Sequence, residues 1–172
     1  MVAAKEDQPR EPEMGSLWTL SFVRGYLELG MLEKAEKELA RLPLEDQHRP
    51  ESLSLAGQIL MARRQWEAAI EVFAIGRALH PGCVDFYVKA AYAYEQVGRL
   101  QESRNMWQLV PRPVGRSGFA HLNLARCEAK LGNLPAARRH ITTALHLDPN
   151  IRALLDNDPG LVQLLNTPGQ SN

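Results

Sequence analysis

The sequence predicts an all-α fold, a solenoid of four stacked helix hairpins closed by a helical segment at its C-terminal end. The first observation behind this prediction is a 34-residue period that runs without insertion from residue 16 to residue 151. The second is that each period holds two apolar stretches with helical spacing, separated by a turn. The third is composition: 45% of the 172 residues are hydrophobic, enough for a core and too many for general disorder.

Residues of the same type return at the same place in each period. One register holds the turn residue, glycine in three units: Gly30, Arg64, Gly98 and Gly132. A second register holds a small residue: Ala35, Ala69, Ser103 and Ala137. A third register holds a large apolar residue: Leu39, Phe73, Trp107 and Ile141. The four units are therefore residues 16–49, 50–83, 84–117 and 118–151.

The residue pattern of each unit predicts a first helix, a turn and a second helix, in that order. The first helix carries an apolar stripe, and a glycine that accepts a left-handed conformation ends it. The small residue lets the second helix approach the first, and the large apolar residue fills the space between neighbouring hairpins. A proline then stops the second helix. One such hairpin cannot bury its apolar face alone, but stacked copies can.

Two prolines, Pro43 and Pro111, come about one turn early, so the second helices of the first and third units are expected to end short. Longer loops follow, at 43–50 and 111–118. The second loop has two interpretations. It is a spacer that keeps the register, or a basic rim through which Arg112 and Arg116 touch a partner. Connecting loops are usually polar, which favours the spacer.

The C-terminal segment continues the apolar pattern over residues 152–166 and is expected to form a capping helix on the last hairpin. Asp158 is placed to cap this helix, and Pro159 stands in its first turn. The alternative is that its leucines leave an adhesive end, so we expect a monomer or a weak dimer. Residues 1–15 and 167–172 are expected to be disordered tails.

These residue classes at this period resemble the tetratricopeptide repeat family. The fourth unit is the most similar, with Gly132, Ala137, Ile141, Ala144 and Pro149 on the family's signature positions. The resemblance covers all four units. It implies a right-handed superhelix in which the first helices line a concave face. It also implies a function, that of a non-catalytic adaptor or scaffold that holds a peptide or a helix of a partner protein.

The same resemblance implies a set of side chains in the concave groove: Arg24, Gln58, Lys89, Tyr92, Asn123 and Arg126. Arginine suits a carboxylate or a peptide carbonyl, and tyrosine offers a flat contact. The alternative is that these are solvated side chains on an open face. The first three units do not match the lysine and asparagine clamp with which some family members grip the acidic tails of heat-shock chaperones.

Two other functions stay open on the sequence alone. Small bacterial chaperones of type III secretion also carry tandem repeats of this kind, and the run 119–128 is loosely similar to their last repeat. Such a protein would mask a segment of a client. The other alternative is a structural module that oligomerises through its terminal faces.

Several functions are excluded or disfavoured by composition and spacing. The chain has 20 basic and 20 acidic residues, and this balance excludes a strongly basic nucleic-acid binder. The sequence shows no metal-site spacing, no nucleotide fingerprint and no nucleophile motif, so we expect no catalytic residue, no metal and no cofactor. Cys83 and Cys127 do not suggest a disulfide framework, which favours a cytoplasmic location. No segment has membrane-spanning length, so membrane insertion is not expected.

Overall fold

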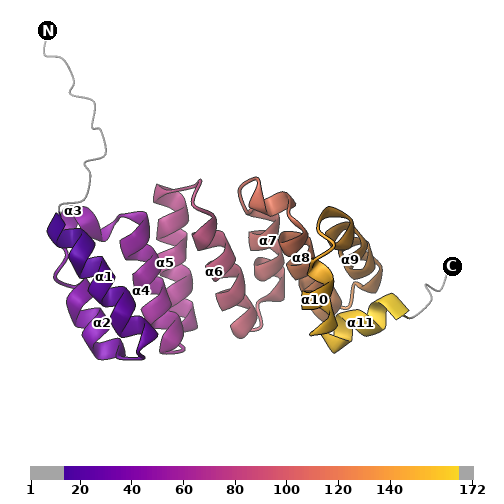
Figure 1. Cartoon of the computed structure of the whole chain (residues 1–172), viewed down its shortest axis with the longest axis horizontal. Coiled ribbons are helices and arrows are strands. Elements are labelled where there is room, and N and C mark those ends of the chain that lie inside the picture. The colour runs from indigo at the N-terminus through magenta and orange to yellow at the C-terminus, as the bar shows by residue number, and fades with distance from the viewer. Residues whose placement is uncertain (1–13, 167–172) are drawn as a thin grey trace, which may run out of the picture.

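The helices of the chain stack side by side in one elongated array, with the two termini at opposite ends (Figure 1). The structure is a computed structural model that describes residues 14–166. Within these residues there is no strand, and no helix is long and apolar enough to cross a membrane. The predicted fold class is confirmed: a right-handed α-solenoid of four helix hairpins with a helical cap.

Each hairpin consists of a first and a second helix. The hairpins are α1 (Met14–Glu28) with α2 (Leu32–Leu39), α4 (Pro50–Ala62) with α5 (Trp66–Leu79), α6 (Val84–Gln96) with α7 (Leu100–Leu109), and α8 (Gly118–Lys130) with α9 (Leu134–Leu147). The second helix of each hairpin packs on the first helix of the next, and α4 also contacts both α1 and α6. The first helices of the first three hairpins therefore form one continuous face.

The first helix begins at Met14, two residues before the first repeat unit. Met14 and Gly15, which the sequence assigned to a disordered tail, are therefore helical. The rest of that tail, 1–13, and the C-terminal tail, 167–172, lie outside the described residues.

The turns inside the hairpins are alike. Gly30, Gly98 and Gly132 have φ angles of 70°, 75° and 79°, and Arg64, in the same register, has a φ of 59°. The amide after each of them donates to a carbonyl five residues back, as in Gln65 N to Leu60 O at 2.9 Å. This is the Schellman arrangement that ends a helix. Arg64 thus holds a left-handed conformation that costs a side-chain-bearing residue about 1 kcal/mol.

The core depends on close approach of helices at small residues. All four residues of the small register are fully buried. Two glycines in the middle of helices, Gly57 and Gly76, likewise allow aromatic rings to approach the backbone closely. A Cβ added at Gly57 would lie 2.1 Å from Phe73 Cε1, and one at Gly76 would lie 2.6 Å from Phe86 Cδ1. Each ring therefore packs directly on glycine backbone, Phe73 within the second hairpin and Phe86 between the second and the third.

The loop 43–50 does more than keep the register. It contains a short helix, α3 (Leu44–Gln47), and the side chain of Asp46 is only 2% exposed. Asp46 accepts a hydrogen bond from Ser16 Oγ and pairs with Arg49. The bond from Ser16 holds the pKa of the Asp46 carboxyl below its usual value. The loop therefore ties the start of α1 to the chain that enters α4.

The loop 111–118 forms a single 3-10 turn, η1 (Val114–Arg116), as the early proline suggests. Its last part prepares the next helix, because Ser117 Oγ accepts from Ala120 N at 3.2 Å and caps α8. Arg112 and Arg116 are exposed. A partner contact at this loop stays a prediction.

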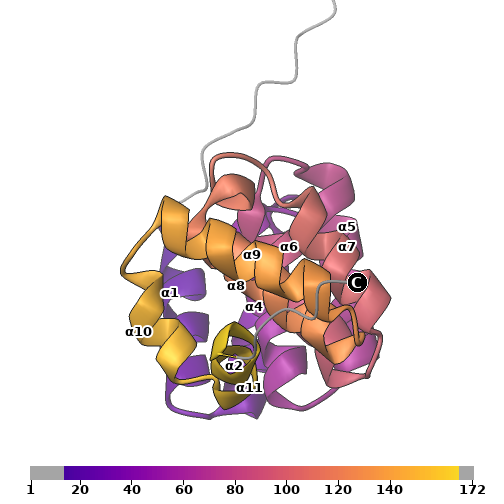
Figure 2. The same ribbon diagram turned by 90° about the vertical axis from the view of Figure 1, so that its right-hand side faces the viewer.

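Two short helices, α10 (Ile151–Asp156) and α11 (Pro159–Asn166), close the array at its C-terminal end (Figure 2). Leu155 is completely buried and Leu161 is 2% exposed. They pack in one cluster with Leu122 of α8 and Ile141 of α9. Leu155 and Leu161 of the cap are therefore buried against the last hairpin of the same chain.

Candidate functional site

An open groove of about 440 Å³ crosses the first helices of the first three hairpins. Its walls combine apolar and polar side chains from α1, α4 and α6. The charged, hydroxyl and amide side chains that line it are Arg24, Glu28, Glu51, Ser54, Gln58, Asp85 and Lys89. The sequence-predicted residues of the first three units thus share one site, with the exception of Tyr92.

A polar network holds the middle of the groove. Ser54 Oγ donates to Asp85 Oδ2 at 2.6 Å, which links α4 to α6. Gln58 Nε2 donates to Ser54 Oγ at 3.0 Å, and Lys89 pairs with Asp85 one turn away on α6. Gln58 and Lys89 are therefore oriented by their neighbours, and the charge of Lys89 is compensated inside the groove.

Arg24 is in a different state. Its side chain is exposed on α1, and within residues 14–166 it has no hydrogen bond and no ion pair. An unpaired guanidinium in a groove keeps all its donors for a ligand.

Tyr92 lies further along α6 and does not line the groove. Its ring is 48% exposed and meets the ring of Trp66 edge to face, with centroids 6.0 Å apart. Trp66 begins α5, so the tyrosine is supported by the preceding hairpin. A supported, half-exposed ring is the geometry of a flat contact surface.

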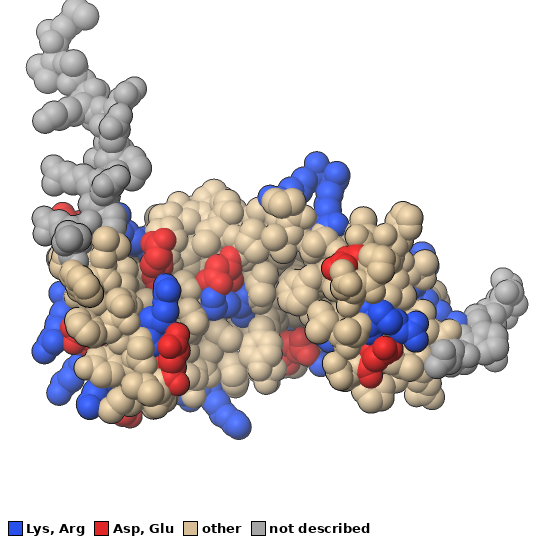
Figure 3. Space-filling view, viewed as in Figure 1, with Lys and Arg blue, Asp and Glu red and all other residues tan. Residues whose placement is uncertain are grey.

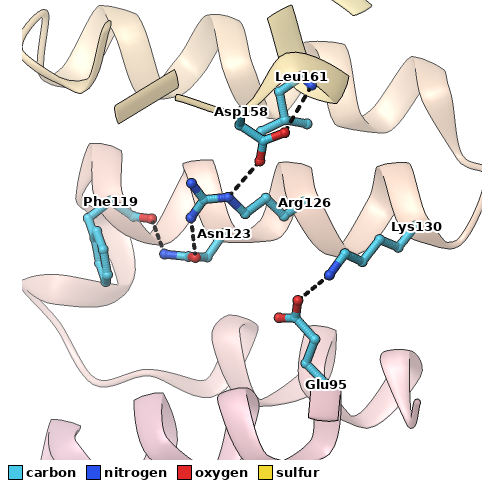
Figure 4. A network of polar contacts seen from close by, with 7 residues as sticks. All are labelled: Glu95, Phe119, Asn123, Arg126, Lys130, Asp158 and Leu161. Atoms are coloured by element: carbon cyan, nitrogen blue, oxygen red, sulfur yellow. Dashed lines mark hydrogen bonds and ion pairs between the residues drawn. The ribbon is translucent and has the colours of Figure 1, made fainter. Parts of the chain in front are cut away.

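Arg126 and Asn123 belong to the fourth hairpin, where the cap has already engaged them (Figure 4). Arg126 Nε donates to Asp158 Oδ2 at 3.0 Å, and its Nη1 donates to Asn123 Oδ1 at 3.0 Å. Asn123 Nδ2 in turn donates to Phe119 O at 2.9 Å. Arg126 lines a second hollow beside α11, and neither residue lines the groove of the first three hairpins.

Sequence reasoning missed two features of this face. It did not foresee that Asp158, the residue predicted to cap α11, also binds Arg126. It also passed over the groove carboxylates Glu28 and Glu51. The sequence could have indicated Glu28 as a groove residue, because it follows Arg24 by one helical turn and lies on the same face of the helix.

The chemically active side chains elsewhere are engaged in packing. His121 and His140 meet through their Nδ1 atoms at 3.0 Å, and burial lowers the pKa of both imidazoles. Cys127 is buried against Ser103, and burial raises the pKa of its thiol. Among residues 14–166, no three His, Cys, Asp or Glu side chains gather as ligands for a metal ion.

The fold agrees with that of known proteins. Residues 54–109 match the tetratricopeptide repeat family. Two solved structures with the same fold are MamA from Desulfovibrio magneticus RS-1 and TTC0263, a thermophilic tetratricopeptide repeat protein of Thermus thermophilus. The MamA chain, which starts at its residue 41, is 15% identical with a TM-score of 0.70, over 89% of this chain and 92% of that chain. TTC0263 is 14% identical with a TM-score of 0.67, over 86% and 79% of the two chains.

The family match and the shared fold together show that the chain carries tetratricopeptide repeats. A curated relative, the CTR9 homologue of Arabidopsis thaliana, is 30% identical over 115 residues, which are 64% of this chain. The chain spans only 10% of the length of that relative.

Proposed function

We propose that this chain is a non-catalytic adaptor that holds a segment of a partner protein in the groove between α1, α4 and α6. The observation that carries the proposal is the groove itself. Its volume of about 440 Å³ is in the range of ligand sites, and its walls offer both apolar surface and oriented polar groups. A repeat protein that holds another protein is a scaffold, and proteins of this family generally act through such contacts.

The side chains of the groove support a peptide or a helix as the ligand. Gln58 presents an amide held in place by Ser54, and Arg24 presents an unpaired guanidinium. Both groups suit the carbonyls and side chains of a polypeptide. Tyr92 extends the contact surface along α6 beyond the groove. Asn123 and Arg126 contribute only if the contact with Asp158 opens.

The experiment is an affinity capture from native lysate with quantitative mass spectrometry, using three forms of the full chain. Gln58→Trp fills the groove with a large ring. Gln101→Trp makes the same change on the exposed surface of α7 and is the matched control. We expect one partner to bind wild type and Gln101→Trp and to be lost from Gln58→Trp. Circular dichroism verifies that all three are helical. Equal capture by all three contradicts the proposal.

An exposed apolar face on α1 favours a second candidate, the structural module that associates with itself. Trp18 is 63% exposed and Phe22 is 55% exposed, and their spacing places them on one side of the helix. Sedimentation velocity tests this function. A dimer that Trp18→Lys with Phe22→Lys abolishes would support it, and a monomer at high concentration would reject it.

The secretion-type chaperone is the competing prediction. It requires a client that copurifies with the chain and precipitates without it. The cytoplasmic location and the absence of a nucleic-acid partner also stay predictions.

A further inference from the structure

The basic residues of the first-helix face are mostly neutralised within the chain. Lys89 pairs with Asp85, Lys130 pairs with Glu95, and Arg126 pairs with Asp158 (Figure 4). Seen from the side of Figure 1, acidic and basic side chains are intermixed over the surface, without a large patch of one sign (Figure 3). Within residues 14–166, the side seen in Figure 3 therefore offers no large basic patch to an acidic partner.

The carboxylates of the groove are less compensated. Glu28 ends α1, and Glu51 stands in the first turn of α4. Both are exposed groove residues, and within residues 14–166 neither forms an ion pair or a hydrogen bond through its side chain. With Lys89 and Asp85 cancelling each other, Arg24 shares the groove with two unpaired carboxylates. The groove thus carries one net negative charge.

The helix ends affect the two carboxylates differently. Glu28 lies at the C-terminal end of α1, where the helix dipole adds a partial negative charge, whereas Glu51 lies at the N-terminal end of α4, where the dipole is partly positive. A cation near Glu28 therefore feels both the carboxylate and the helix end. A ligand carboxylate at Arg24 would instead compete with Glu28, which lies one turn away.

We propose that the segment held in this groove is basic, with lysine or arginine side chains directed at Glu28 and Glu51. The inference rests on the proposed function, because it names the chemistry of the ligand of the same groove. It differs from the carboxylate that the arginines of the predicted groove would suit, since Arg126 is bound to Asp158. The chain's own residues 1–13 do not meet the requirement, because they hold four acidic and two basic side chains.

The test selects random 12-residue peptides displayed on phage against the full chain and counts only clones that do not bind Gln58→Trp. We expect these groove-dependent peptides to be net positive. The tightest one is then synthesised, and its Kd is measured by fluorescence anisotropy. Glu28→Gln with Glu51→Gln should weaken binding about tenfold at low salt, and added salt should shrink the difference.

The matched control removes two exposed carboxylates outside the groove, Glu67→Gln with Glu71→Gln on α5. This variant has the same net charge and should bind like wild type, which separates a local contact from general attraction. Groove-dependent peptides that are neutral or acidic would overturn the inference and leave the adaptor function standing. Peptides that all bind Gln58→Trp as well would overturn both.

Discussion

Arg126 Nε lies 3.0 Å from Asp158 Oδ2, and the other oxygen of that carboxylate, Oδ1, accepts from Leu161 N at 3.3 Å. One aspartate therefore caps α11 and docks it on α8. Neither role depends on a ligand, so the contact belongs to the resting fold.

Removal of Asp158 should cost more stability than removal of Arg126. Asp158→Ala loses the helix cap, which is worth about 1 kcal/mol, together with a half-buried ion pair worth about 0.5–1 kcal/mol. Arg126→Ala loses the same pair and the hydrogen bond to Asn123 Oδ1, but it leaves the helix cap in place. Urea unfolding of both variants and of the double variant measures the two effects and their coupling. A larger cost for Arg126→Ala would contradict the double role of Asp158.

A methyl group at Gly57 should destabilise the fold by about 2–3 kcal/mol, because the Cβ would lie 2.1 Å from the ring of Phe73. Gly25→Ala is the control, since nothing lies within 4 Å of a Cβ at that site. Gly25 is inside α1, so the same change there should stabilise by about 0.5–1 kcal/mol. Chemical denaturation of both variants decides the question. Equal effects would mean that Phe73 moves aside without cost.

Arg64 should be replaceable by glycine with a gain in stability. Its φ of 59° strains a residue with a Cβ by about 1 kcal/mol, and the greater freedom of glycine in the unfolded chain offsets part of that. We expect Arg64→Gly to exceed Arg64→Ala by about 0.5 kcal/mol in free energy of unfolding. Thermal melts of the two variants test this. An advantage for alanine would show that the turn relaxes when its side chain is shortened.

The histidine pair should make the fourth hairpin sensitive to acid. Burial lowers the pKa of His121 and, with help from His121, that of His140. The unfolded chain binds protons near the ordinary pKa of 6.5, whereas the folded chain resists them. The contribution of the two histidines to the free energy of unfolding is therefore fully present above pH 6.5. It is lost as the pH falls through their folded pKa values.

Thermal melts at about pH 7.5 and about pH 5.5, on either side of that pKa, measure this effect, with His121→Asn and His140→Asn together as the comparison. We expect the wild type to lose more of its Tm over this interval than the variant. Glu128, which raises the pKa of His140, and Arg139, which lowers it, are present in both proteins. An identical pH dependence would show that the pair does not control the response.

The period made most of the fold predictable. Residue type at the turn and at the small register depends only on backbone conformation and on the approach of two helices, so the sequence expresses both directly. Pro43 and Pro111 likewise predicted the early ends of α2 at Leu39 and of α7 at Leu109. The buried Asp46 was not predictable, because its partner Ser16 is 30 residues away in α1 and Asp46 itself lies in α3, a loop helix that the 34-residue period does not repeat.

The candidate site was predictable in position but not in charge. The register of Arg24, Gln58 and Lys89 placed them in a shared groove, since parallel copies of one helix present equal positions to one side. Whether a charge is free depends on neighbours outside the register. Lys89 is compensated from its own helix and Arg126 from the cap, and neither partner follows from the 34-residue period.

The buried side chains fall into three separate clusters along the array, one near each end and one in the middle. Within residues 14–166, each hairpin packs on its neighbours in sequence, so the two ends are connected through the central hairpins. The chain should therefore open in stages, and hydrogen exchange should be slowest in α5 and α6 and faster toward both ends. A ligand in the groove would slow exchange in α1 and α4 while α11 continued to open at its own rate.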